Sequence, residues 1–169
     1  CQVAEWSARP HVPLTHSARV VPLGEILKVV KRHGAAGKAI GVVGLGAGTT
    51  SCYAQAGQDW TFYEIDPAVE RVARNPDLFT YLSNCAVNPN IVLGDGRLSL
   101  KTRPDDSLDL LLLDAYSSDS LPIHLMTREA LRRYMAQLRP HGRASFHTPN
   151  RDPRLGRGSG HSARAAGPV

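Results

Sequence analysis

A glycine-rich turn and a single acid hold the residue types that could bind a nucleoside. In Gly44-Leu45-Gly46-Ala47-Gly48 the missing side chains let the backbone turn sharply and approach a ligand closely. About twenty residues later, an apolar run ends at Glu64, whose carboxylate could accept hydrogen bonds from both hydroxyls of a ribose. The glycines alone would suit a plain tight turn, but the turn and the acid together predict a nucleoside site.

The spacing of the glycines separates two classes of nucleoside. A dinucleotide-binding fingerprint requires Gly-x-Gly-x-x-Gly. Here the sixth position is Thr49, and the third glycine comes one place early, at Gly48. The spacing therefore favours an adenosyl sulfonium over NAD.

A second acid, Asp95, lies between Gly94 and Gly96 after another short apolar run. Its carboxylate could accept a hydrogen bond from an adenine amino group. Considered by itself, the segment fits an Asp-Gly turn better. Both interpretations stay open here, and Asp95 and Gly96 are candidate cofactor-binding residues.

Two further acids, Asp114 and Asp119, follow a leucine run and enclose Ala115-Tyr116-Ser117-Ser118. Carboxylates beside a cationic sulfonium could hold an amine nucleophile and accept its proton. Asp119 would equally suit a solvated loop or a helix cap. We expect Asp114 to be catalytic, and Asp119 and Tyr116 to contact the substrate.

Short apolar runs predict the strands that must position these residues. They cover residues 39–43, 60–65, 91–93, 108–113 and 144–147, and their length and β-branched content are typical of parallel strands buried on both faces. The segments between them can be helical, so the alternation predicts an α/β fold with a doubly wound, mainly parallel, Rossmann-like sheet. Such sheets bind ligands beyond the carboxyl ends of their strands, where the candidate residues lie.

Two segments show helical periodicity. Leu23 to Arg32 predicts a short amphipathic helix, and Thr127 to Leu138 predicts a clearer one. Thr127 could cap the second helix, although Glu129 follows two residues later instead of the three that a full capping box needs.

Composition indicates one soluble globular domain, because 169 residues with 42% hydrophobic and 21% charged residues are ordinary values. We expect a lead segment over residues 1–38, a nucleoside-binding α/β domain over residues 39–150, and a disordered tail over residues 151–169, which is rich in Arg, Gly, Ser and Pro.

The charge distribution argues against a nucleic-acid partner. The tail holds four arginines and one aspartate, so three of the five net positive charges lie there. Lysines and arginines elsewhere are interspersed with acids, and no sustained basic stripe is left to follow a phosphate backbone.

Neither a membrane segment nor a metal site is expected. The uncharged stretch from Ala39 to Gln58 is too glycine-rich and polar for a membrane span. The cysteines Cys1, Cys52 and Cys85 lack metal-ligand spacing, and any disulfide scheme leaves one of them unpaired. We therefore expect a chain without metal in the reducing cytoplasm.

Taken in order, these motifs resemble the spermidine synthase (polyamine aminopropyltransferase) family of the S-adenosylmethionine-dependent methyltransferase superfamily. The similarity covers roughly residues 10–151 and includes Glu64-Ile65-Asp66-Pro67. It is closest to the spermidine synthase-like domains that follow a transporter-like region, which have counterparts of residues 60–67 and 121–131. The resemblance implies the class I methyltransferase fold.

The resemblance also implies a reaction and roles for residues. Decarboxylated S-adenosylmethionine would donate an aminopropyl group to a diamine such as putrescine, within a homodimer. Glu64 would bind the ribose, Asp95 the adenine and Asp119 the diamine, and Asp114 would be the catalytic carboxylate.

Three departures keep two other functions open. The family spaces its loop acids as Asp-x-x-Asp, whereas Asp114 and Asp119 are further apart. The lead segment lacks the tyrosines and the glutamine that the family supplies to its diamine pocket. The tail lacks the hydrophobic periodicity that the family shows there. The alternatives are an S-adenosylmethionine-dependent methyltransferase and a catalytically idle nucleoside-binding or scaffold domain.

Overall fold

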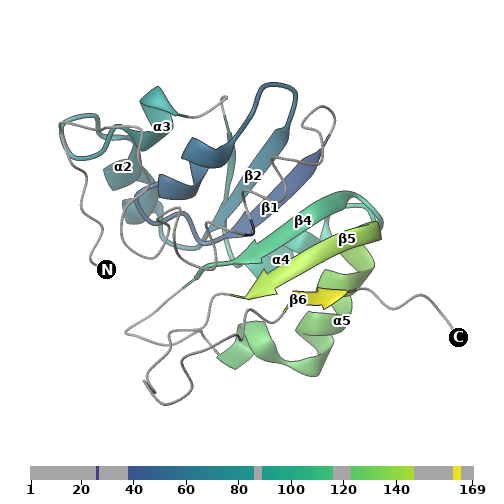
Figure 1. Cartoon of the computed structure of the whole chain (residues 1–169). Coiled ribbons are helices and arrows are strands. Elements are labelled where there is room, and N and C mark those ends of the chain that lie inside the picture. Colours follow the sequence, from purple (N-terminus) through teal and green to yellow (C-terminus); the bar gives the residue numbers. More distant parts are fainter. Residues whose placement is uncertain (1–25, 27–37, 86–88, 116–122, 147–161, 165–169) are drawn as a thin grey trace, which may run out of the picture.

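The computed structural model describes residue 26 and residues 38–85, 89–115, 123–146 and 162–164, and places a six-stranded sheet among short helices (Figure 1). The elements, in chain order, are β1 (Ala39–Val43), η2 (Thr49–Tyr53), β2 (Asp59–Glu64), α2 (Pro67–Arg74), α3 (Tyr81–Asn84), β3 (Asn90–Leu93), α4 (Gly96–Lys101), β4 (Leu108–Leu113), η3 (Ile123–Met126), α5 (Arg128–Gln137), β5 (Leu138–Phe146) and β6 (Ser162–Arg164).

The strand order is β3-β2-β1-β4-β5-β6, and the first five strands run parallel. Only β6 is antiparallel, paired with β5. The chain builds outward from β1 to β2 and β3, and then returns to place β4 on the other side of β1. The order therefore reverses between β1 and β4, which is where open α/β sheets bind ligands. The predicted doubly wound, mainly parallel sheet is confirmed.

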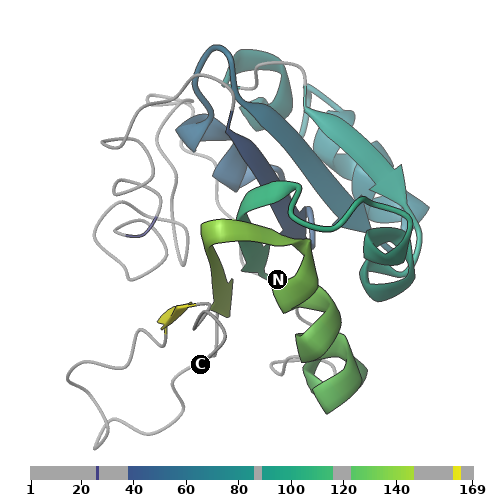
Figure 2. The same ribbon diagram turned by 90° about the vertical axis from the view of Figure 1, so that its right-hand side faces the viewer.

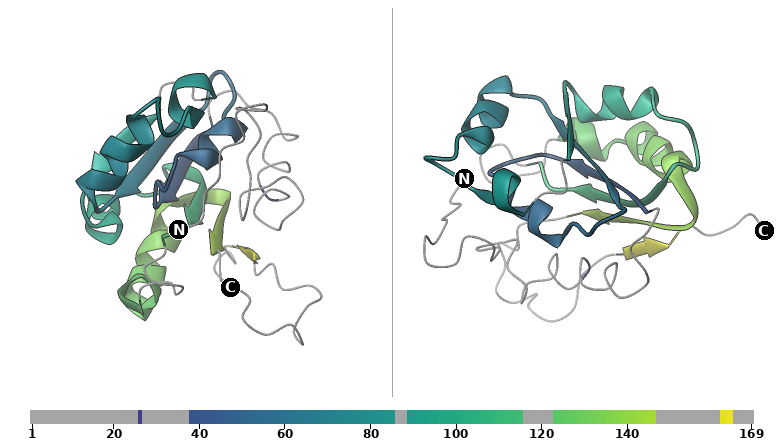
Figure 3. Two further views of the ribbon diagram at one scale, coloured as in Figure 1. Left: turned by 90° about the vertical axis from the view of Figure 1, so that its left-hand side faces the viewer. Right: turned by 90° about the horizontal axis from the view of Figure 1, so that it is seen from above.

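Alternate residues of the central strands build two apolar layers, one on each face of the sheet. Val43, Leu111 and Leu113 pack with Leu100 of α4 and Tyr134 of α5. The opposite face is formed by the intervening side chains of the strands, packed against Tyr53 of η2 and Ala73 of α2. Figure 2 shows α5 on one side of β5 and β6 on the other, and Figure 3 shows α4 and α5 on the opposite side of the sheet from η2. Because both faces are covered, the strands read in sequence as continuous apolar runs.

The predicted strands agree closely with the observed ones. The first and fourth have the predicted bounds, whereas the second and third each begin one residue earlier. The main difference is β5, which starts at Leu138, directly after α5. Its early residues Pro140 and His141 are exposed, and His141 has a positive φ of 78°, so this half of the strand shows no apolar pattern.

The second predicted helix is confirmed as α5, and Thr127 is its N-cap. The Thr127 hydroxyl oxygen accepts a hydrogen bond from the Ala130 amide at 3.2 Å. The first predicted helix, Leu23 to Arg32, lies outside the described residues except for Ile26, which is helical. In the segment 151–169 the structure describes only β6, a strand that the sequence did not predict. Within the described ranges, no helix is long and apolar enough to cross a membrane.

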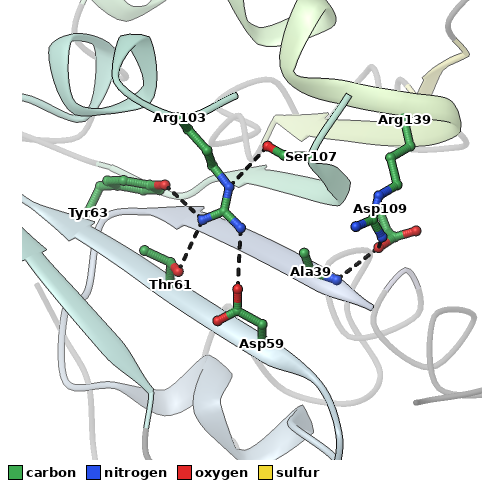
Figure 4. A network of polar contacts seen from close by, with 8 residues as sticks. All are labelled: Ala39, Asp59, Thr61, Tyr63, Arg103, Ser107, Asp109 and Arg139. Atoms are coloured by element: carbon green, nitrogen blue, oxygen red, sulfur yellow. Dashed lines mark hydrogen bonds and ion pairs between the residues drawn. The ribbon is translucent and has the colours of Figure 1, made fainter. Parts of the chain in front are cut away.

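A polar network supports the amino edge of the sheet (Figure 4). The Arg103 guanidinium, which follows α4, donates to the Ser107 hydroxyl at 3.1 Å and to Asp59 Oδ2 at 3.3 Å. It also donates to the Thr61 hydroxyl at 3.4 Å and the Tyr63 hydroxyl at 3.5 Å. One side chain thus joins the β2 strand to the turn that leads into β4.

A second group on the same edge is centred on Asp109 of β4 (Figure 4). Its Oδ2 accepts hydrogen bonds from the Ala39 amide at 2.8 Å and from Arg139 of β5 at 2.6 Å. These contacts join the starts of β1, β4 and β5. The candidate site residues lie at the other edge of the sheet, at the carboxyl ends of the strands.

Candidate functional site

Three loops meet at the carboxyl edge of the sheet because each continues the hydrogen-bonding of its strand for one residue. The amides of Gly44, Gly94 and Asp114 donate, each at 2.8 Å, to the carbonyls of Tyr63, Glu64 and Val43, respectively. The glycine turn, the Asp95 loop and Asp114 are therefore placed side by side by backbone contacts alone.

The glycine turn depends on backbone angles that other residues rarely adopt. Gly44, Gly46 and Gly48 have φ values of 100°, 55° and 80°. A Cβ added at Gly44 would lie 2.6 Å from the Asp114 carbonyl oxygen, whereas one added at Gly46 would meet no atom of the described residues within 4 Å. Gly44 thus packs against the start of the Asp114 loop, and the exposed tip at Gly46 leaves room for a ligand.

Glu64 holds the glycine turn in place. Its side chain is 8% exposed. One carboxylate oxygen, Oε2, accepts a hydrogen bond from the Leu45 amide at 2.9 Å, and Oε1 accepts one from the Asp66 amide at 3.0 Å. A carboxylate has about four acceptor positions, so two remain for the hydroxyls of a ribose. The residues present fit a nucleoside at this position.

Asp95 is the N-cap of α4. Its Oδ1 accepts hydrogen bonds from the Arg97 amide at 2.8 Å and from the Leu98 amide at 3.4 Å, and its Oδ2 lies 3.5 Å from the Arg97 guanidinium. Capping therefore occupies one oxygen, and Oδ2 is the atom that could face an adenine. Gly96 is buried, and a Cβ there would lie 2.8 Å from Val43, so its missing side chain lets α4 begin against β1.

Asp114 is partly exposed, directly after β4. Its backbone carbonyl lies beside Gly44, so the predicted catalytic residue adjoins the glycine turn at the point where strand order reverses. The other two predicted substrate contacts, Tyr116 and Asp119, lie outside the described residues. Their roles stay predictions.

Ile65 is a candidate contact that the sequence patterns did not indicate. Its side chain is 66% exposed between Glu64 and Asp66, at the same edge as the glycine turn. An exposed apolar side chain beside the predicted ribose-binding acid could cover the face of a base. The predicted run 60–65 includes Ile65, whereas β2 ends at Glu64, the residue at which the sequence also placed the carboxyl end of the strand.

The structure joins Cys52 and Cys85 in a disulfide, which sequence reasoning did not predict. The bond links η2, which continues the glycine turn, to the end of α3. The spacing of the cysteines carried no signal for this pair, since only the tertiary fold brings η2 and α3 together. In the part of the chain that the structure describes, no cluster of three or more His, Cys, Asp or Glu side chains could hold a metal ion.

Comparisons with known proteins show which family and fold the chain resembles. No protein-family model matches the chain. A polyamine aminopropyltransferase from Vibrio vulnificus is 33% identical over 97 residues, which cover 53% of this chain and 30% of that protein. The chain therefore spans less than a third of this curated relative.

Solved structures show the same fold at lower sequence identity. A probable spermidine synthase from Corynebacterium glutamicum aligns over 70% of this chain and 42% of its own, with a TM-score of 0.59 and 21% identity. The spermidine synthase from Thermotoga maritima aligns over 64% and 37%, with a TM-score of 0.53 and 19% identity. A SAM-dependent methyltransferase from Archaeoglobus fulgidus aligns over 75% and 53%, with a TM-score of 0.50 and 16% identity. The chain thus has the Rossmann-like fold of the class I methyltransferases, and the resemblance to polyamine aminopropyltransferases that its motifs predicted is confirmed.

Proposed function

We propose that this chain is the nucleoside-binding and catalytic part of a spermidine synthase-like aminopropyltransferase. It would move an aminopropyl group from decarboxylated S-adenosylmethionine to a diamine such as putrescine. The observation that carries the proposal is the placement of Asp114 against Gly44, where the strand order reverses. The sequence similarity to a polyamine aminopropyltransferase supports this reaction above others on the same fold.

Each candidate site residue that the structure describes would have a physical task in this reaction. The turn at Gly46 and the free acceptor positions of Glu64 hold the nucleoside, and Ile65 and Asp95 Oδ2 contact the base. The donor supplies the aminopropyl carbon that is bonded to its sulfonium sulfur. The bond between this carbon and the sulfur breaks, and methylthioadenosine leaves. Asp114 holds the amine in line with that carbon and accepts the proton that the amine nitrogen loses as the new carbon–nitrogen bond forms.

Several finer points belong to the same proposal. Tyr116 and Asp119 would hold the far end of the diamine, and two copies of the protein would form a dimer. The protein would act in the cytoplasm, without a metal and without binding nucleic acid. The Cys52–Cys85 disulfide bears on this location, because a disulfide in a reducing compartment is usually transient and redox-sensing.

A methyltransferase is the second candidate function. It is favoured by the likeness of the fold to SAM-dependent methyltransferases. The glycine turn and Glu64 would contact only the nucleoside portion of the donor, so they would suit carboxylated and decarboxylated donors equally. Donor preference therefore separates the two reactions.

The test is calorimetric titration with S-adenosylmethionine, its decarboxylated form and methylthioadenosine, followed by an assay for methylthioadenosine release with putrescine. Preference for the decarboxylated donor and diamine-dependent release would support the proposal. Tighter binding of the carboxylated donor would favour methyl transfer. Binding without turnover in the wild type and in Asp114→Ala would indicate an idle nucleoside-binding domain.

One variant tests the role of Asp114 directly. Asp114→Asn should keep its nucleoside affinity within about twofold and lose about a hundredfold or more in turnover, since proton transfer by a positioned group contributes about 10² to 10⁴. The exposed Asp77→Asn is the matched control, because it removes the same charge from a residue outside the three loops of the site. Equal turnover in the two variants would contradict a catalytic role for Asp114.

A further inference from the structure

The Cys52–Cys85 disulfide links η2, which continues the glycine turn, to α3, which packs on it. Gly48, the last glycine of the turn, is the N-cap of η2, and Cys52 lies within that single turn of helix. Cys85 is the C-cap of α3. The bond therefore joins the segment that continues the nucleoside loop to the helix that packs on it.

Direct contacts couple α3 to the glycine turn. Leu82 of α3 lies so close to Gly48 that a Cβ added there would be 2.7 Å from its Cγ. The buried Ser51 hydroxyl donates to the Tyr81 carbonyl at 3.3 Å. A displacement of α3 would therefore change the packing of Leu82 against Gly48, which must keep a φ of 80° to complete the turn.

The helix α3 is too short to hold this position through its own hydrogen bonds. It spans four residues, and its N-cap Thr80 makes no side-chain capping hydrogen bond. Isolated helices shorter than about 12 residues are marginal in water, so α3 depends on tertiary contacts. The disulfide is the strongest of these contacts, because it is covalent.

We infer that Cys52 and Cys85 form a thiol–disulfide switch that orders the glycine turn and so regulates nucleoside binding. This inference rests on the proposed function for the identity of the ligand. In the disulfide form α3 supports Gly48 and the turn is already ordered. In the dithiol form the ligand must order the turn as it binds. The free-energy cost of this ordering lowers the affinity for the ligand.

The chemistry of the switch requires only a small-molecule disulfide such as oxidised glutathione. The thiolate of one cysteine attacks that disulfide, forms a mixed disulfide and releases one thiol. The second cysteine then attacks the protein sulfur, forms the Cys52–Cys85 bond and releases the second thiol. The protein loses two protons and two electrons, and the oxidant gains both. Both cysteines are partly exposed, so a small thiol or disulfide can reach them.

The test compares the full chain after oxidation by oxidised glutathione and after reduction by dithiothreitol. Calorimetric titration with methylthioadenosine should show at least about fivefold weaker binding in the reduced protein, the lower end of typical coupling between linked sites. Cys52→Ser and Cys85→Ser should bind like the reduced protein under both conditions. Cys1→Ser, the matched control, should keep the full redox response. Equal affinity of the oxidised and reduced wild type would overturn the inference.

A second measurement separates this inference from the proposed function. Hydrogen exchange of the amides in residues 48–53 and 81–85 needs no ligand, and it should be faster in the reduced protein. Unchanged exchange would overturn the switch even if nucleosides bind. Failure of both redox forms to bind any of the three nucleosides would overturn the proposed function, and the exchange rates would still decide whether the disulfide orders the turn.

Discussion

Gly44 and Asp114 lie in contact, although seventy residues separate them in the sequence: a Cβ on Gly44 would be 2.6 Å from the Asp114 carbonyl oxygen and 2.9 Å from its carbonyl carbon. They follow β1 and β4, the two strands between which the strand order reverses. Backbone packing therefore positions the glycine turn and the predicted catalytic residue against each other.

Gly44→Ala should destabilise the protein by about 3 kcal/mol or more. The methyl group would clash with the Asp114 carbonyl, and the residue would have to keep a φ of 100°. Backbone strain costs about 1 to 3 kcal/mol and overpacking about as much again. Urea denaturation measures the loss. Gly46→Ala is the control, because its Cβ would meet no described atom and only the strain at its φ of 55° remains. Equal losses in the two variants would argue against the contact.

Glu64→Gln should weaken both the fold of the glycine turn and nucleoside binding. The Glu64 carboxylate accepts from the Leu45 and Asp66 amides, and an amide side chain has only one oxygen for these two donors. We expect a loss of about 1.5 to 3 kcal/mol in unfolding free energy, the range for a hydrogen bond to a charged group. Methylthioadenosine affinity should fall about tenfold, as measured by calorimetry. Glu70→Gln, which removes a partly buried acid paired with the exposed Arg74 on α2, should change affinity little.

Arg103→Met should lower stability and leave nucleoside binding unchanged. The substitution keeps most of the aliphatic stem and removes the hydrogen bonds to β2 and Ser107 on the amino edge of the sheet (Figure 4). Several of these contacts are long and Asp59 is exposed, so we expect a loss of about 1 kcal/mol. Urea denaturation and methylthioadenosine titration of the same preparation measure the two effects. A change in affinity above about twofold would show that the two edges are coupled.

Tyr134 should make the protein less stable at alkaline pH. Burial, and to a lesser degree the nearby Asp95 charge, raises the pKa of Tyr134 from 10.0 to about 12 against a smaller opposing effect of Arg97. The folded state therefore keeps its proton where the unfolded state loses it. This stabilisation is complete below about pH 10 and is lost as the pH rises toward 12, by about 2 to 3 kcal/mol.

Tyr134→Phe should remove this part of the alkaline loss. The Tyr134 hydroxyl has no hydrogen-bond partner among the described residues, so the substitution should cost little at neutral pH. Urea midpoints measured from about pH 9 to pH 12 would show the difference between variant and wild type. Parallel pH profiles for the two proteins would contradict the prediction.

The sequence alone determined the first four strands and the residues at their carboxyl ends. Residues 39–43 and 108–113 are apolar throughout because both faces of a parallel strand are buried, and such runs are read directly from composition. The glycine spacing and Glu64 at the end of β2 then predicted a nucleoside site at that edge. The strands depend on local chemistry and the structure confirms them, whereas the nucleoside site stays a prediction.

Only the tertiary structure decided which of these residues meet. The contact of Gly44 with Asp114, the pairing of Cys52 with Cys85 and the exposure of Ile65 all depend on non-local contacts. Periodicity shows which side chains are buried, but it does not show which strand is beside β1 or which helix packs on η2. Those choices follow from the packing of whole layers, since each layer must cover the apolar face of its neighbour.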